Sequence, residues 1–210
     1  MTETDGLLRG ADGRLRCWWG ASAPEYVPYH DHEWGFPVTD DVRLFEKLSL
    51  EGFQSGLSWL TILRKREGFR RAFAGFDFER IARFGSRDVA RLLADRAIVR
   101  NRAKIEAVIN NARRAAELVE QEGSIAKYVW QFEPERRPRL LNREALRALA
   151  QTAESKSLAR DLKRRGWRFV GPTTVYAFMQ AMGLVNDHIA GCEPGAEAQR
   201  ARKRFRSPAS

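Results

Sequence analysis

Cysteine and histidine are scarce in this sequence, and long apolar runs are absent. Its 210 residues include two cysteines and three histidines, too few for a disulfide framework. No run approaches the roughly 18 apolar residues of a membrane-spanning helix. The N-terminal segment MTETDGLLRG contains no apolar core of a secretory signal. We therefore expect a cytoplasmic protein without a membrane partner, whose two thiols stay reduced.

Strand-like alternation of apolar and polar residues is also absent, as are internal repeats. The apolar residues recur at helical spacing instead, which predicts an all-α fold. Helices are predicted at residues 42–50, 78–84, 87–94, 101–122, 124–132, 142–151, 155–165 and 172–182, with a further apolar stretch at 57–63. The predicted caps are Asp40 or Asp41, Asp77, Ser86 and Ser124 at N-termini and Gly123 at a C-terminus.

The length allows one domain, or two lobes that share a core. We expect a single helical domain with two lobes at residues 15–193, preceded by a mobile extension at 1–14. A basic, flexible tail is expected at 194–210, where the ARKRFR segment adds charge that can touch nucleic acid. Residues 133–139, with two prolines and several charges, are the predicted surface loop.

The charge is strongly unbalanced. Lysine and arginine number 37 against 27 acidic residues, which gives a net charge of +10. A basic surface of this kind favours a polyanionic partner, and arginine suits bidentate contacts with phosphate. The alternative, a solvated basic surface with no partner, stays open on charge alone.

The two cysteines each lie near a histidine, as Cys17-x12-His30 and His188-x3-Cys192. The four-residue step of the second pair places both ligands on one face of a helix or tight turn. Two thiolates and two imidazoles fill a tetrahedral zinc shell and leave no position for water. Three alternatives remain: a disulfide, two unrelated buried cysteines, and His32 in place of His30.

The segment from Leu162 to Gly183 predicts two helices joined by a tight turn. Its Arg-Phe-Val-Gly-Pro-Thr run at 168–173 has the form of a helix-hairpin-helix turn. Gly171 allows close approach to a phosphate, and the following helix start presents unpaired N–H groups. Lys163, Arg164, Arg165 and Arg168 surround the turn with positive charge. Such a turn binds the DNA backbone without recognising the base sequence. The alternative is an ordinary corner between two helices with a solvated basic face.

A single acid, Glu51, lies among many aromatic residues. It follows an apolar helix and precedes Gly52, so we expect it to point inward from the helix end. A buried glutamate needs a partner, and a glutamate among aromatic rings is a receptor for a flat cation. The alternative is a carboxylate that caps a helix or pairs with an arginine. The aromatic residues are Trp19, Tyr26, Tyr29, Trp34 and Trp59.

Together these features resemble the DNA-3-methyladenine glycosylase I family. The matching blocks lie between about Cys17 and Cys192: Tyr29-His30-Asp31-x-Glu33-Trp34-Gly35, LEGFQSGLSW, Phe169-Val170-Gly171 and FMQAMGLVNDHIAGC. The departures are Trp18, where a small residue would be unsurprising, and the extended termini. The resemblance implies a helix-hairpin-helix glycosylase fold, with a zinc snap that joins the N- and C-terminal segments.

The resemblance also implies roles for particular residues. One structural zinc ion is then held by Cys17, His30, His188 and Cys192, so that His30 is selected over His32. Glu51 is the catalytic residue, and the base pocket consists of Trp19, Tyr29 and Trp59, with Tyr26 beside them. The segment from Gln54 to Leu57 fills the gap left in the duplex. The expected DNA contacts are Gln54, Gly56, Leu57, Lys163, Arg165, Arg168, Val170, Gly171 and Thr173.

The implied function is excision of 3-methyladenine from alkylated double-stranded DNA, with the base flipped into the aromatic pocket. The helix at 172–182 contains no lysine, so we expect a monofunctional enzyme without Schiff-base chemistry. Asp187 is expected to orient the ring of His188. A monomer suffices for lesion search. The alternatives are a broader alkylpurine glycosylase, a non-catalytic binder of DNA structure and a protein–protein module.

Overall fold

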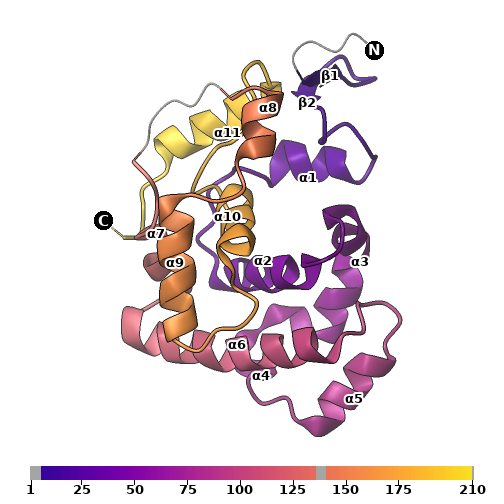
Figure 1. Cartoon of the computed structure of the whole chain (residues 1–210), viewed down its shortest axis with the longest axis vertical. Helices are drawn as coiled ribbons and strands as arrows, with labels where there is room; N and C mark the ends of the chain where they lie inside the picture. Colours follow the sequence, from indigo (N-terminus) through magenta and orange to yellow (C-terminus); the bar gives the residue numbers. More distant parts are fainter. Residues whose placement is uncertain (1–5, 136–140, 210) are drawn as a thin grey trace.

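The computed structural model describes residues 6–135 and 141–209, and it is mostly helical, as the sequence predicts (Figure 1). Two short strands come first, β1 (Leu7–Arg9) and β2 (Leu15–Cys17). The helices are α1 (Tyr26–His32), α2 (Asp41–Gln54), α3 (Trp59–Ala72), the 3-10 turn η1 (Ala74–Phe76), α4 (Phe78–Ile81), α5 (Ser86–Ala94), α6 (Arg102–Glu122), α7 (Ile125–Trp130), α8 (Arg143–Ala148), α9 (Ala153–Arg164), α10 (Pro172–Ala181) and α11 (Glu193–Arg204). Within the described residues, none of these helices has the length and apolar character needed to cross a bilayer.

The strands β1 and β2 correct the expectation of an all-α chain with a mobile extension at 1–14. They form an antiparallel hairpin in which Leu7 pairs with Cys17. Each strand has three residues, too few for an alternating pattern to show in the sequence. Tertiary burial holds the hairpin instead, because Leu7 packs with Ile189 and Cys192 from the other end of the chain. Residues 1–5 of the predicted extension lie outside the described residues.

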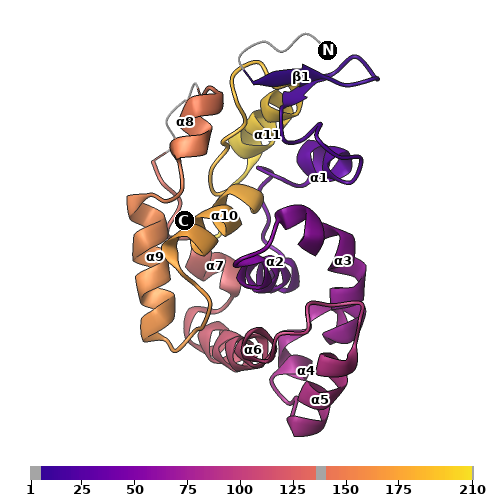
Figure 2. The ribbon, with the colours of Figure 1, turned by 45° about the vertical axis from the view of Figure 1, so that its right-hand side comes forward.

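The helix α11 corrects the expectation of a flexible tail at 194–210. Its Ala198 is fully buried, and Arg202 donates a hydrogen bond to Glu133 at 2.9 Å. The buried face consists largely of small residues, so apolar spacing gives no sign of it. In both views α11 lies beside α1 and the N-terminal hairpin (Figures 1 and 2), and it packs against α1 and β2. The N-terminal hairpin therefore lies with α1 and α11, segments that are far apart in the sequence.

The capping predictions are mostly confirmed. Asp40, Asp77 and Ser124 each accept the N–H of the residue three positions on, and Gly123 ends α6 with a φ of 89°. Ser86 is an exception, because α5 begins at Ser86 and Gly85 precedes it as the cap. The Asp88 carboxylate accepts the N–H of Gly85 there.

Helix α2 crosses the centre of the molecule and supplies the core with Leu44, Phe45, Leu50 and Phe53. It packs against α3, α6, α7 and α10. Three charged residues of α2, namely Glu46, Lys47 and Glu51, are buried with these apolar side chains. Since buried charges require partners, α2 is where a polar site enters the core.

Candidate base pocket, metal cluster and DNA surface

Glu51 is buried, as predicted, with an exposed fraction of 5%. It lies within α2 and not at its end, because the helix continues to Gln54. The partner of its carboxylate is Lys47, one turn earlier, whose Nζ lies 2.6 Å from Oε1 of Glu51. The alternative interpretation named a helix terminus or an arginine as the partner of Glu51, whereas the structure pairs it with a lysine on the same helix.

The ammonium of Lys47 connects Glu51 to two of the predicted pocket aromatics. Its Nζ donates a hydrogen bond to the hydroxyl of Tyr29 at 2.8 Å and lies 3.2 Å from the centroid of the Trp59 ring. The rings of Tyr29 and Trp59 are 5.4 Å apart. The structure thus brings Glu51, Tyr29 and Trp59 around one cation, as a receptor for a flat cation requires.

Sequence reasoning missed Lys47. The available signal is its spacing, four residues before Glu51 on a predicted helix, at which opposite charges meet. Burial lowers the pKa of the Lys47 ammonium, an effect opposed by the charge of Glu51. Burial also raises the pKa of the Tyr29 hydroxyl well above its usual value, so Tyr29 stays protonated.

Trp19 extends this aromatic cluster in the direction of the predicted zinc ligands. Its ring lies 6.3 Å from that of Tyr29, 5.6 Å from that of Tyr26 and 5.0 Å from that of His30. Tyr26 is half-buried and contacts Trp19 edge to face. Trp34 also packs on Trp19, with centroids 4.9 Å apart. The predicted pocket aromatics therefore form one continuous group beside Glu51.

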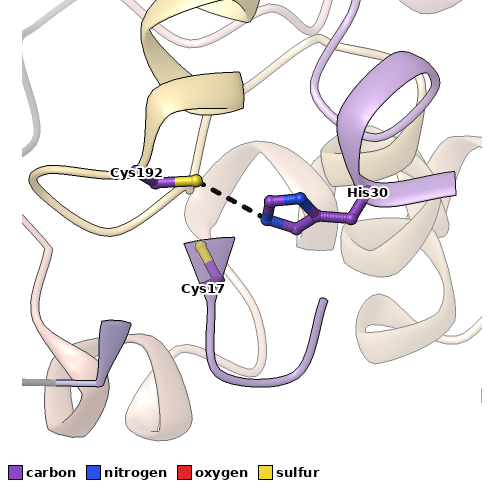
Figure 3. Close-up of side chains that lie close together, drawn as sticks. All are labelled: Cys17, His30 and Cys192. Carbon is purple, nitrogen blue, oxygen red and sulfur yellow. Dashed lines mark hydrogen bonds between the residues drawn. The ribbon is translucent and has the colours of Figure 1, made fainter. Parts of the chain in front are cut away.

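Three of the four predicted zinc ligands lie together. The Sγ atoms of Cys17 and Cys192 and a ring nitrogen of His30 are within 4.8 Å of one another, and all three residues are buried (Figure 3). They come from β2, α1 and the start of α11. His32, the rival of His30, is exposed. Both thiols are free, so no disulfide joins them.

His188, the fourth predicted ligand, lies next to this cluster but is not one of the three. Its ring contacts the ring of His30, with centroids 4.8 Å apart. Its Nδ1 donates to Asn186 at 2.7 Å, and its Nε2 is buried without a hydrogen-bond partner among the described residues. Burial lowers the pKa of His188 to about 3, so the ring is neutral. An orphaned neutral nitrogen beside two cysteines and a histidine fits a zinc shell.

The surroundings of the cluster orient these rings. Nδ1 of His30 donates to Asp31 at 2.8 Å, which leaves Nε2 directed at Cys192, and Arg16 holds both oxygens of Asp31. A hydrogen bond from the Cys17 thiol lowers the pKa of Cys192 to about 5 and raises that of Cys17. A hydrogen bond like the one between the Asp31 carboxylate and the His30 ring commonly accompanies a histidine that binds a metal.

The sequence predicts that Asp187 orients the His188 ring, but in the structure Asn186 makes the hydrogen bond to that ring. The hydrogen bond to the His188 ring comes from Asn186, whereas the Asp187 carboxylate accepts from Tyr176 and from Gln180 at 3.0 Å. Both of these donors are on α10. Asp187 therefore ties the segment before His188 to α10, the helix that follows the predicted hairpin turn.

The predicted hairpin lies between α9 and α10, and helix α6 holds its turn. The Asn111 side chain donates to the carbonyl of Arg168 at 2.9 Å and accepts its N–H at 2.8 Å. Gly171 caps α10 without a side-chain acceptor, and Pro172 occupies its first turn. The N–H groups at the start of α10 are therefore available to an anion.

The predicted DNA contacts of the hairpin differ in exposure. Lys163, Arg168 and Thr173 are exposed and Gly171 is half-buried, whereas the Val170 side chain is buried. Phe169, which sequence reasoning did not select, is 39% exposed and has a positive φ of 56°. A positive φ in a bulky residue is unusual and marks the tip of this turn.

Arg165 is engaged inside the protein. Its guanidinium bonds Asp161 at 2.8 Å, Gln121 at 2.8 Å and Glu122 at 2.6 Å, and it lies over the Tyr128 ring. These contacts link α9 to α6 and α7. The geometry therefore gives Arg165 a structural position, in contrast to the exposed Arg168.

The predicted gap-filling segment follows α2 and lies near the hairpin. Gln54 is half-buried, Gly56 and Leu57 are exposed, and Gly56 has a φ of 78°. Lys104 of α6 donates to the carbonyls of Phe53 and Ser55 at 2.9 and 2.5 Å. A methyl group on Gly52 would lie 3.4 Å from Phe169. The loop with Gly56 and Leu57 and the hairpin turn with Phe169 thus both border the end of α2. Both lie close to the helical turn that carries Glu51.

Comparison with known proteins agrees with this arrangement. Residues 18–195 match the family model described as methyladenine glycosylase. The chain is similar to DNA-3-methyladenine glycosylase 1 of Escherichia coli, with 44% identity over 84% of this chain and 95% of that protein. A crystal structure of a 3-methyladenine DNA glycosylase I shows 48% identity and a TM-score of 0.78, covering 85% of this chain and 98% of that chain. A structure from Staphylococcus aureus, described as the basis of 3-methyladenine recognition, shows 36% identity and a TM-score of 0.79, with coverages of 84% and 94%. The chain therefore belongs to the methyladenine glycosylase family.

Proposed function

We propose that this protein is a DNA repair glycosylase that hydrolyses the N-glycosidic bond of 3-methyladenine in alkylated double-stranded DNA. The observation that carries the proposal is the buried carboxylate of Glu51 beside the rings of Tyr29 and Trp59, with a cation already bound between them. Methylation at N3 gives adenine a positive charge, which a carboxylate and two aromatic rings attract. The relatives named for this activity support the same assignment.

The chemistry follows from the charge of the base. Once the nucleotide is flipped out of the duplex, Glu51 accepts a hydrogen bond from the purine edge, and Tyr29, Trp59 and Trp19 line its faces, with Tyr26 behind Trp19. The electron pair of the glycosidic bond passes to the purine, which leaves uncharged. The sugar carbon becomes oxocarbenium-like, takes oxygen from a water molecule, and that water loses a proton. A cationic purine needs no protonation, so a second acid is unnecessary.

The DNA surface consists of two parts. The hairpin, with Lys163, Arg168, Gly171 and Thr173, binds backbone phosphates through the N-terminus of α10 and positive side chains. The loop with Gln54, Gly56 and Leu57 enters the gap that the flipped nucleotide leaves. Both parts border the turn of α2 that carries Glu51. A single copy of the chain provides every element, so the proposed enzyme acts as a monomer.

The proposed metal is one structural zinc ion held by Cys17, His30, His188 and Cys192. The orphaned Nε2 of His188 and the clustered ring nitrogen and thiols support this donor set. Four protein ligands complete the shell, so the ion would stabilise the fold and supply no reactive water. It would join the N-terminal hairpin to α11.

The proposed enzyme is monofunctional. Helix α10 (Pro172–Ala181) contains no lysine, so the position after the hairpin offers no amine to the sugar carbon. Lys47 is an ammonium paired with Glu51, which has no free electron pair for attack. Abasic sites therefore remain as the product.

The test is the identity of the bases released from methylated duplex DNA, separated by chromatography. The proposal predicts release of free 3-methyladenine while the strands stay intact. Release of 3-methylguanine or 7-methylguanine at a comparable rate would favour the broader alkylpurine glycosylase. DNA binding without release of any base, by folded and zinc-loaded protein, would overturn the enzymatic proposal.

A further inference from the structure

Lys47 already engages three members of the proposed base receptor, namely Glu51, Tyr29 and Trp59. One ammonium bonds the carboxylate of Glu51 at 2.6 Å and the hydroxyl of Tyr29 at 2.8 Å, and it lies 3.2 Å above the Trp59 ring. Lys47 is 5% exposed. The proposed function has no use for this residue, since a carboxylate and two aromatic rings suffice to receive a cation. The Lys47 ammonium occupies the position proposed for the cationic base, and this needs a separate explanation.

The Trp59 face cannot hold an ammonium and a purine at the same time. At 3.2 Å from the centroid, Nζ occupies the layer in which a stacked base would lie. The flexible stem of lysine lets the ammonium move along α2 while its charge stays near the site. Base binding therefore requires Lys47 to leave the Trp59 face and to share Glu51 with the incoming base.

Lys47 also changes the net charge of the pocket. Glu51 alone would give the receptor a negative charge, whereas Glu51 and Lys47 together give none. The nearest further charges, Glu33 and Arg66, form an ion pair with each other at 2.7 Å, so they do not restore the negative charge. The substrate base is a cation and the released base is uncharged. A neutral pocket holds these two forms more equally than a negative pocket does.

We propose that Lys47 is a specificity-determining residue whose ammonium competes with the positive charge of the base for Glu51 and Trp59. The proposal rests on the proposed function, because it assumes that Glu51, Tyr29 and Trp59 receive the base. Lys47 weakens binding of the cationic base more than binding of the uncharged product base, because both bases displace the ammonium from Trp59 but only the cation competes with it for the charge of Glu51. It acts as an internal competitor that the charged base displaces.

The test compares two free bases that differ in charge. The ion 3,9-dimethyladeninium carries a permanent positive charge, as the base does in DNA, whereas 3-methyladenine at mildly alkaline pH is largely uncharged. Binding of each compound to the wild type and to Lys47→Met is measured by isothermal titration calorimetry. Lys47→Met is expected to bind the cation at least about tenfold more tightly and to change binding of 3-methyladenine much less.

Two further variants accompany the binding measurements on Lys47→Met, one as a second test and one as a control. Lys47→Gln keeps hydrogen bonds to Glu51 and Tyr29 while it removes the charge, so it tests the proposal if Lys47→Met leaves Glu51 too poorly satisfied to fold. Lys156→Met removes an exposed positive charge on α9 and is expected to bind both compounds as the wild type does.

Equal changes for both compounds would mean that Lys47 acts only by its bulk, and unchanged binding would mean that it does not compete; either result overturns the proposal. Binding of the cation that Glu51→Gln leaves unaltered would instead place the base elsewhere, and the proposed pocket would fail together with this inference. The two failures are therefore distinguishable.

Discussion

At the scale of single residues, the buried pair of Glu51 and Lys47 defines the chemistry of the pocket. A lone buried carboxylate costs several kcal/mol unless it is paired or protonated. Lys47 removes this cost on the same helix, and the Tyr29 hydroxyl gives the ammonium a second partner. Each of the two buried charged groups thus has a partner.

The residue-scale prediction for the metal cluster contrasts two histidines that are two positions apart. His30→Ala is expected to lose zinc and to lower the melting temperature substantially, because binding to a structural site contributes to folding stability. His32→Ala is expected to retain one zinc ion per chain, since His32 is exposed. Atomic absorption and thermal denaturation measure both effects. Full zinc content in His30→Ala would remove His30 from the shell.

The sequence predicts part of the candidate site, and the limits have physical causes. The burial of Glu51 follows from its place in an apolar helix, and the clustering of Cys17, His30 and Cys192 follows from ligand chemistry and the family resemblance. Lys47 was missed because lysine ammonium groups are almost always in water. In the folded protein its contacts with Glu51, Tyr29 and Trp59 take the place of that water.

At the scale of elements, ion pairs between α6, α7 and α9 stabilise the approach to the hairpin. Asp161 of α9 accepts from the Tyr128 hydroxyl at 2.8 Å and from Arg165 at 2.8 Å, and Arg165 continues to Glu122 of α6. Burial alone would raise the pKa of the Asp161 carboxyl, but hydrogen bonds from Arg165, Tyr128 and Arg164 outweigh it and lower the pKa.

Asp161→Asn is therefore expected to lower the free energy of unfolding by about 1–3 kcal/mol near neutral pH. Because the pKa of Asp161 is lower in the folded protein, its contribution is present above the unfolded value of 3.8 and is lost as the pH falls through the folded value. The wild type and the variant should thus converge below about pH 4. Urea denaturation across the acidic range checks this, and a constant difference would contradict the assigned ionic role.

Of the elements that the sequence analysis did not predict, which also include α1 (Tyr26–His32), the two strands and α11 depend on tertiary contacts. Strands β1 and β2 have three residues each, and α11 buries small residues such as Ala198. Neither the short strands nor the small buried residues of α11 give an apolar pattern that stands out in a basic, polar stretch of sequence. The long helices α2, α6 and α10 carry their signal in caps and apolar spacing, and the sequence predicts them within a few residues.

At the scale of the whole molecule, the net charge of +10 contributes to DNA binding only where the basic side chains are exposed. Arg168 is exposed on the hairpin, whereas Arg165 is bonded to Asp161 and Glu122. The two arginines are three positions apart and offer a matched pair of variants.

Arg168→Gln is expected to reduce the slope of log affinity against log salt concentration by about one, the effect of one lost phosphate contact. Arg165→Gln is expected to lower the melting temperature and to leave that slope unchanged. Fluorescence anisotropy with undamaged duplex DNA at several salt concentrations measures both slopes. Equal slopes in Arg168→Gln and the wild type would remove the hairpin from the DNA surface.

Strand β2, helix α1 and the residue before α11 supply Cys17, His30 and Cys192, which lie together. The central helix α2 carries Glu51 and Lys47, and the hairpin borders its C-terminal end. In the proposed function the metal cluster, the base receptor and the DNA surface therefore come from separate parts of the chain.

The central claim, that Glu51 in its aromatic pocket excises a cationic base, is tested most directly by single-turnover release of 3-methyladenine from methylated duplex DNA. Glu51→Gln is compared with Glu46→Gln, a control on the same helix whose carboxylate is paired with Arg70 at 2.9 Å. We predict a loss of about 100-fold or more in Glu51→Gln and release near the wild-type rate in Glu46→Gln. Undiminished release by a folded Glu51→Gln protein would contradict the account.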